Sequence, residues 1–172
     1  RIERGANYIE IDAKAAAYSP VHEEDACQMR SSLFLMGALL GRFGEVLLPY
    51  PGGCAIGKRP IDIHLEALRQ MNVSLVEDEH GIYGYTKTLT GTVLNLRYPS
   101  VGATQNIILA AVKADGKTVI MNAAKEPEIV ELCLMLNKMG ADIHGMGTAR
   151  VTIYGVSHLH DTSFTMAADR IV

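Results

Sequence analysis

The sequence is poor in cysteine and lacks a long apolar run. Its 172 residues include three cysteines, Cys27, Cys54 and Cys133. An odd number without a dense spacing pattern argues against a disulfide framework. No apolar run reaches the ~18 residues that a membrane span needs, and no signal peptide is visible. We therefore expect a cytoplasmic protein that does not enter a membrane.

A strong excess of charge of one sign is also missing. Sixteen Lys and Arg residues stand against 19 Asp and Glu residues, which gives a formal net charge of −3. This balance, together with the lack of a basic stripe, disfavours nucleic acid and anionic membranes as partners. An anionic ligand would have to be held by a local cluster of positive groups.

Length and composition fit a single domain over residues 1–172. The hydrophobic fraction of 48% and the charged fraction of 20% are ordinary for a globular protein. A chain of this length can bury a sizeable core without disulfides or metals. The chain begins with Arg1 instead of Met, and it stops at Ile171 and Val172 in the middle of a pattern. We therefore expect a piece of a longer protein.

Apolar spacing and turn residues predict helices and short strands. The helices are expected at 23–40, 60–71, 102–114 and 127–139. Pro60 and Pro127 favour the first turns of two of them. Short segments between the helices predict strands, and several of them are rich in Val, Ile, Thr and Tyr. The strands are expected at 7–11, 45–48, 73–76, 82–86, 92–96, 117–121, 150–154 and 162–166.

The order of these elements repeats along the chain. One unit of strand, helix, strand, helix, strand, strand covers about 7–86, a second covers about 92–154, and a third begins within 162–172. The predicted fold is therefore an α/β domain with helices buried beneath sheets, in contrast to an open Rossmann-type sheet. The first unit has a longer loop than the second, and an insertion in one repeat is typical of a functional loop.

That longer loop runs from Pro49 to Asp62 and reads PYPGGCAIGKRPID. Its three glycines allow close approach of the backbone to a ligand. Lys58 and Arg59 precede a predicted helix N-terminus, a combination that favours an anion. The same cations favour the thiolate of Cys54 and make it a candidate reactive cysteine. We expect residues 50–58 to be poorly ordered or variable without a ligand.

Each of these residues also has a plain structural interpretation. A lone cysteine is more often a small buried residue than a catalyst, so spacing alone leaves Cys54 open. Cys27 and Cys133 fall within predicted helices, and we expect both to be core residues. Arg59 alone could be a solvated surface charge, and Arg30 could be a surface charge on a helix.

Several segments carry a resemblance to a known family. PGGCAIGKRPIDIHL resembles the catalytic loop of the UDP-N-acetylglucosamine enolpyruvyl transferases, and MRSSLFLMGALLGRFG resembles their phosphate-arginine helix. SVGATQNIILAA and NAAKEPEIVELCLMLNKMGA are similar to two further signatures. The match runs from about Met29 to the C-terminus. Separated motifs in the correct order are far more specific than any one of them.

The resemblance implies an enolpyruvyl transferase-like inside-out α/β barrel domain, built from repeated βαβαββ units with buried helices. It implies transfer of the enolpyruvyl group of phosphoenolpyruvate to the 3′-hydroxyl of UDP-N-acetylglucosamine, with release of phosphate and without a cofactor or a metal. This is the first committed step of peptidoglycan synthesis. The family's active site lies between two domains, and the second domain is absent from this chain. The resemblance therefore implies about half of an active site.

The resemblance also implies roles for individual residues. Cys54 matches the proton donor, and Arg30 and Arg59 match arginines near the reacting phosphate. Residues 59–63 match a uridine-binding stretch, and residues 98–102 match a loop that meets the diphosphate. The implied substrate-binding residues are Arg30, Arg59, Pro60, Ile61, Asp62, Ile63, Tyr98, Pro99, Ser100, Val101 and Gly102. Further positions at the cleft are Glu128, Asp169 and Arg170.

Two of these residues have structural alternatives, and two other functions stay open. Ser100 can be an N-cap, and Glu128 can favour a helix dipole. A catalytically silent paralogue that binds UDP-sugars would share the fold, but nucleotide binding alone needs no thiol such as that of Cys54. A nucleic-acid module on the related RNA-cyclase fold is disfavoured by the net charge of −3.

Overall fold

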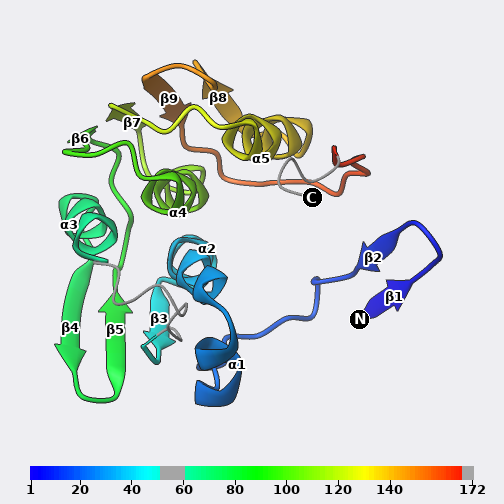
Figure 1. The fold of residues 1–172 in the computed structure, drawn as a ribbon, viewed down its shortest axis with the longest axis horizontal. Coiled ribbons are helices and arrows are strands. Elements are labelled where there is room, and N and C mark those ends of the chain that lie inside the picture. Colours follow the sequence, from blue (N-terminus) through cyan, green and yellow to red (C-terminus); the bar gives the residue numbers. More distant parts are fainter. Residues whose placement is uncertain (51–60, 168–172) are drawn as a thin grey trace.

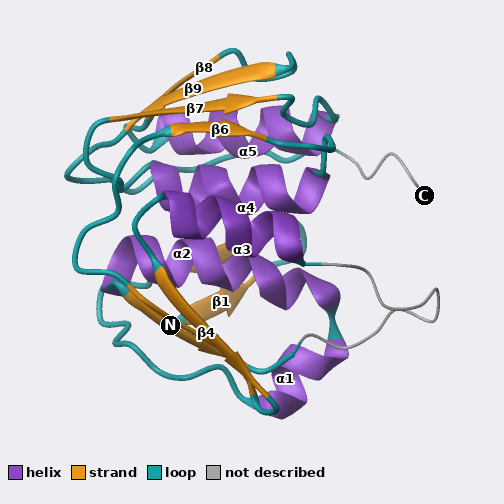
Figure 2. Ribbon diagram, turned by 90° about the vertical axis from the view of Figure 1, so that its left-hand side faces the viewer, coloured by secondary structure: helices purple, strands orange, loops and turns teal. Residues whose placement is uncertain are grey.

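Two sheets enclose a layer of helices (Figure 2). The computed structural model describes residues 1–50 and 61–167, apart from the side chain of Arg30. The first sheet has the strand order β3–β5–β4, and all its pairs are antiparallel. The second has the order β6–β7–β9–β8, in which β6 and β7 are parallel. Helices α2, α3, α4 and α5 lie between the two sheets (Figures 1 and 2). The predicted α/β fold with buried helices is thus confirmed.

The strands are β1 (Ile2–Arg4), β2 (Ile9–Ile11), β3 (Glu45–Leu48), β4 (Ser74–Asp78), β5 (Gly81–Tyr85), β6 (Val93–Asn95), β7 (Lys117–Met121), β8 (Asp142–His144) and β9 (Arg150–Tyr154). The helices are α1 (Glu23–Gln28), α2 (Phe34–Phe43), α3 (Asp62–Gln70), α4 (Val101–Ala111) and α5 (Pro127–Lys138), with a 3₁₀ turn at Arg30–Leu33. Elements β6 to β9 follow the βαβαββ order.

Local sequence explains where the central helices begin and end. Ser100 caps α4, since its hydroxyl oxygen accepts the Ala103 N–H at 3.2 Å. Pro127 occupies the first turn of α5, as its fixed φ favours, and α5 ends at Lys138 with Met139 as its C-cap, one residue before the predicted end. Helix α2 ends at Gly44, whose φ of 74° is the left-handed conformation that glycine adopts without strain.

The core is centred on the contact between α2 and α4. Helix α4 buries residues on most of its circumference, including Ile107 and Ile108, which have no exposed surface. The two helices approach so closely at Gly37 that a Cβ there would lie 2.1 Å from the backbone oxygen of Asn106. Only glycine at position 37 permits this spacing, because backbone cannot move aside as a side chain can.

The predicted strand at 7–11 does not join the first sheet. Its residues 9–11 form β2, which pairs with β1 in a separate hairpin that projects from the rest of the chain (Figure 1). In the second sheet, β6 pairs in parallel with β7, on the side of β7 away from β9. At the equivalent side of β3, the segment before α1 supplies a hydrogen bond from Val21 N–H to Leu47 O at 3.2 Å. The first unit therefore differs from the predicted order at its first strand.

Two further expectations need correction, and one strand was not expected. The single helix expected at 23–40 breaks at Met29, whose φ of −147° and ψ of 140° are extended. The Ser32 hydroxyl donates to Ala26 O at 3.2 Å and stabilises the break. Residues 162–166 form no strand, and the short strand β8 was not predicted. The single-domain assignment and a third unit starting within 162–172 stay predictions, and residues 168–172 lie outside the described part.

The expectation that residues 50–58 are variable concerns a segment that, beyond Tyr50, lies outside the described residues. The helix expected at 60–71 is described from Asp62 and ends at Gln70 with Met71 as its C-cap, one residue before the predicted end. In residues 1–50 and 61–167, no helix combines the length and the apolar character that crossing a membrane requires.

Candidate functional site

Two segments that are far apart in the sequence meet at the start of α3. Asp62 begins this helix, and its carboxylate forms an ion pair with Arg97, which lies between β6 and α4. The other carboxylate oxygen accepts the Ile63 N–H at 3.0 Å. Both partners are about half exposed, so the pair contributes little to stability. Its effect is to join the segment 61–63 to the segment 97–102.

The N-terminal turn of α4 lies beside that of α3. A Cβ on Gly102 would be 3.3 Å from Cε1 of the His64 ring, so the α3 side chain covers the first turn of α4. Ser100 accepts the Ala103 N–H, and Tyr98 before it is 64% exposed. Two positive helix ends therefore lie next to each other, with the charge of Arg97 balanced by Asp62, and paired helix N-termini favour a negatively charged ligand.

A polar network holds the two helices together in the interior. Nδ2 of Asn106 on α4 lies 3.0 Å from Nδ1 of His64 on α3. Oδ1 of Asn106 accepts the Gly37 N–H of α2 at 2.6 Å. Asn106 has no exposed surface, and His64 is 5% exposed. The amide side chain of Asn106 on α4 thus contacts both α2 and α3.

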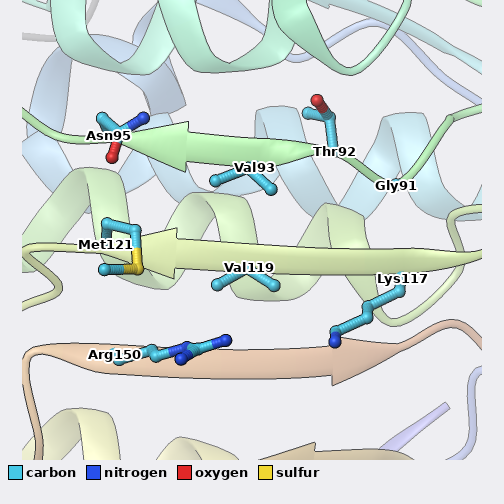
Figure 3. A pocket seen from close by; sticks show the side chains of 8 residues that line it. All are labelled: Gly91, Thr92, Val93, Asn95, Lys117, Val119, Met121 and Arg150. Atoms are coloured by element: carbon cyan, nitrogen blue, oxygen red, sulfur yellow. The ribbon is translucent and has the colours of Figure 1, made fainter.

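A small hollow borders this region. It has a volume of about 140 Å³ and lies between α3 and β6, with Ile63 and Arg97 among its lining residues. A larger hollow of about 690 Å³ lies on the outer face of the second sheet, with Val93, Val119 and Arg150 in its lining (Figure 3). None of the predicted site residues lines the larger one. The candidate site is therefore assigned to the starts of α3 and α4, where the predicted residues gather.

The structure brings together only some of the predicted residues. Ile61, Asp62 and Ile63 at the start of α3 lie close to the segment 98–102 that leads into α4. Glu128 is half-buried in the first turn of α5. Cys54, Arg59, Pro60, Asp169 and Arg170 lie outside the described residues, as does the side chain of Arg30.

The two other cysteines differ from each other. Cys133 is fully buried on α5, as expected, and burial raises the pKa of its thiol to about 11. Cys27 is exposed, with its Sγ 3.7 Å from Tyr50 O, so the prediction that it is a core residue is wrong. Helix α1 is short, and of its residues only Ala26 is buried. Among residues 1–50 and 61–167, no group of three His, Cys, Asp or Glu side chains could hold a metal ion.

Sequence reasoning missed Arg97, His64 and Asn106. Arg97 directly precedes the predicted segment 98–102, and its charge next to a helix start was a usable signal. His64 and Asn106 occur within helices whose neighbours are apolar. Their pairing depends on how α3 packs against α4, which spacing within either helix does not reveal.

Comparison with known proteins places these features in a family. Residues 3–172 match the family of EPSP synthase (3-phosphoshikimate 1-carboxyvinyltransferase). A curated relative from Synechocystis sp., named UDP-N-acetylglucosamine 1-carboxyvinyltransferase, is 45% identical over 99% of this chain and 40% of its own length. A relative from Caldanaerobacter subterraneus, named UDP-N-acetylglucosamine 1-carboxyvinyltransferase 2, is 49% identical over 95% of this chain and 39% of its own length. The chain thus spans about two fifths of the curated relatives it matches.

Solved structures share the fold at lower sequence identity. The enolpyruvyl transferase NikO from Streptomyces tendae matches with a TM-score of 0.73 at 20% identity, over 88% of this chain and 36% of that protein. EPSP synthase from Acinetobacter baumannii matches with a TM-score of 0.57 at 21% identity, over 76% of this chain and 29% of that protein. The nearly complete match of residues 3–172, with this shared architecture, means that the chain belongs to the EPSP synthase family.

Proposed function

We propose that this chain is the nucleotide-sugar-binding and acid-supplying part of a UDP-N-acetylglucosamine 1-carboxyvinyltransferase. The observation that carries the proposal is the convergence of two helix N-termini, those of α3 and α4, beside the Arg97–Asp62 pair. A nucleoside diphosphate is an anion that this arrangement suits. The names of the curated relatives, at 43–49% identity, support the same activity.

The proposed roles divide between binding and chemistry. Residues 59–63 and 98–102 hold the nucleotide, while Arg30 and Arg59 neutralise the reacting phosphate. Cys54, seven residues before Ile61 in the sequence, supplies the acid. Glu128, Asp169 and Arg170 are further candidates at the cleft, and a second domain of the same enzyme completes it.

The chemistry is an addition followed by an elimination. The 3′-hydroxyl of UDP-N-acetylglucosamine gives its proton to a base in the second domain as its oxygen bonds to C2 of phosphoenolpyruvate, while the Cys54 thiol delivers a proton to the methylene carbon. Loss of a proton from that carbon then restores the double bond as phosphate leaves. A cysteine thiol with an unperturbed pKa holds its proton at neutral pH, and a modest lowering of that pKa by neighbouring cations makes the thiol a better acid for this protonation. No metal or cofactor is required, and we place the reaction at the start of peptidoglycan synthesis in the cytoplasm.

The test is phosphate release from phosphoenolpyruvate by the full-length protein that carries this chain. Cys54→Ala should lower the rate by on the order of 10²–10⁴-fold. The affinity for UDP-N-acetylglucosamine, measured by calorimetry, should stay largely unchanged because the nucleotide segments do not depend on the thiol. Cys54→Asp should retain activity, because a carboxylic acid partly removed from water can also donate a proton.

Cys27→Ala and Cys133→Ala are the matched controls, and both should release phosphate at nearly the wild-type rate. A Cys54→Ala protein with wild-type turnover would refute the catalytic role. A wild-type protein that binds the nucleotide sugar without releasing phosphate would instead support the catalytically silent UDP-sugar-binding paralogue.

A further inference from the structure

Asn106 and His64 form a bridge between the two helices that carry the candidate nucleotide segments. His64 follows Asp62 by two positions on α3, and Asn106 follows Ser100 by six positions on α4. The distance from Asn106 Nδ2 to His64 Nδ1 is 3.0 Å. Any rotation or shift of one helix against the other would therefore have to break this contact.

The hydrogen-bond network fixes which atoms donate. Oδ1 of Asn106 accepts the Gly37 N–H at 2.6 Å, so its amide NH₂ faces the imidazole. The NH₂ group can only donate, and Nδ1 of His64 must then accept. The network thus assigns a neutral imidazole with its proton on Nε2. A buried network of this kind specifies one arrangement, because each unmade bond would leave a buried polar group without a partner.

The same imidazole also contacts the start of α4 directly. A Cβ on Gly102 would lie 3.3 Å from His64 Cε1 and 3.5 Å from Phe34 Cε1 of α2. Gly102 belongs to the segment 98–102, so the ring sets the distance between that segment and the first turn of α3. The ring is held at its other side by Asn106.

We infer that Asn106 and His64 are positioning residues that set the spacing of the nucleotide-holding segments 61–63 and 98–102. The inference rests on the proposed function. Neither side chain is assigned a contact with substrate; each acts by fixing the backbone amides and charges that make such contacts. Small displacements of binding groups are costly, since even a shift of about 1 Å can lower a rate by 10²-fold.

The experiment compares two substitutions of Asn106 in the full-length protein. Asn106→Leu keeps the approximate volume but leaves the Gly37 N–H and His64 Nδ1 without their partner. Its dissociation constant for UDP-N-acetylglucosamine, measured by calorimetry, should rise roughly tenfold, as should KM for that substrate, with a smaller change in kcat. Asn106→Asp can keep both hydrogen bonds. One carboxylate oxygen accepts the Gly37 N–H, and the other accepts an N–H at His64 Nδ1 once the imidazole proton has moved there from Nε2. This variant should bind the nucleotide within about twofold of wild type even if burial of the carboxylate lowers the melting temperature.

Ile143→Ala is the control for loss of stability alone. Ile143 is 2% exposed on β8, outside the α3–α4 contact, so its truncation should lower the melting temperature and leave nucleotide affinity unchanged. If Asn106→Leu does not fold, His64→Gln is the replacement variant. Glutamine lacks both an acceptor at the Nδ1 position that Asn106 contacts and the ring that contacts Gly102, so affinity should still fall.

The outcomes separate this inference from the proposed function. A wild-type protein without affinity for the nucleotide sugar would overturn both. Wild-type affinity that is unchanged in Asn106→Leu or His64→Gln would overturn the positioning role alone. Equal losses of affinity in Asn106→Leu, Asn106→Asp and Ile143→Ala would mean that affinity follows overall stability. That result would also overturn the positioning role.

Discussion

At the scale of single residues, Cys27 and Cys133 differ in reactivity because their surroundings differ. Cys133 is fully buried and burial raises its pKa to about 11, whereas Cys27 is exposed. Iodoacetamide at pH 8 should therefore modify Cys27 in the folded protein and leave Cys133 unmodified until the protein is denatured. Peptide mass spectrometry after timed labelling measures both. Equal labelling of the two thiols under native conditions would contradict the burial of Cys133 on α5.

The raised pKa of Cys133 also links stability to pH. The ordinary pKa is 9.0, and the folded value is about 11. Between these values the unfolded chain has lost this proton while the folded chain keeps it. The contribution of Cys133 is therefore fully present below about pH 9, and the free energy of unfolding falls as pH rises toward 11. Denaturant titrations of wild type and Cys133→Ala should show a steeper fall for wild type over this range.

Residue identity alone pointed to part of the candidate site. The segments 59–63 and 98–102 were predicted from their motifs, and the described parts of them do lie together. Arg97, His64 and Asn106 were not predicted. Their roles come from side-chain pairs across α3 and α4, and a single sequence gives no information on which helix faces meet.

At the scale of elements, the close contact of α2 and α4 depends on one missing side chain. A Cβ at Gly37 would lie 2.1 Å from the backbone oxygen of Asn106, so Gly37→Ala must force the helices apart. We expect a loss of about 3 kcal/mol in the free energy of unfolding, at the upper end of overpacking costs. Gly41→Ala in the same helix is the control, because a Cβ at position 41 would lie 3.2 Å from its nearest backbone neighbour, Leu109 O. It should cost less than about 1 kcal/mol, since alanine favours a helix.

Urea unfolding monitored by circular dichroism measures both alanine variants. Similar stabilities for Gly37→Ala and Gly41→Ala would mean that α2 and α4 can separate without cost.

Apolar pattern and turn residues predicted several elements well. Helices α4 and α5 and the strands β3, β7 and β9 appear where the apolar pattern placed them. The failures have physical causes. Strand β8 has three residues with one apolar side chain, Ile143, and forms because β9 offers it hydrogen bonds. Residues 162–166 have β-favouring side chains, yet among the described residues no strand pairs with them, and propensity without a partner is insufficient.

At the scale of the whole molecule, the β1–β2 hairpin stands apart from the two-sheet body (Figure 1). Ile2, Ile9 and Ile11 are 63%, 63% and 68% exposed, and every residue of both strands is exposed. Deletion of residues 1–12 should therefore leave the free energy of unfolding within about 0.5 kcal/mol of the intact chain. Removal of these apolar side chains from the surface should also reduce self-association.

Thermal unfolding at low concentration and sedimentation velocity together test the deletion. Replacement of Ile9 and Ile11 by threonine keeps the hairpin length and is the matched control for the loss of association. A melting temperature several degrees lower after deletion would show that the hairpin packs on the core.

The bond between Val21 and Leu47 has a consequence for how the domain opens. On the side of β3 away from β5, this segment supplies a hydrogen bond where β7 has the parallel strand β6. The amide protons of β3 are thus protected by one neighbouring strand, β5, whereas β7 lies between β6 and β9. Local openings that exchange these protons with solvent should begin in β3 and its neighbours, well before global unfolding. Because β3 comes shortly before Cys54 in the sequence, we expect these openings to begin in the strand that precedes the candidate acid along the chain.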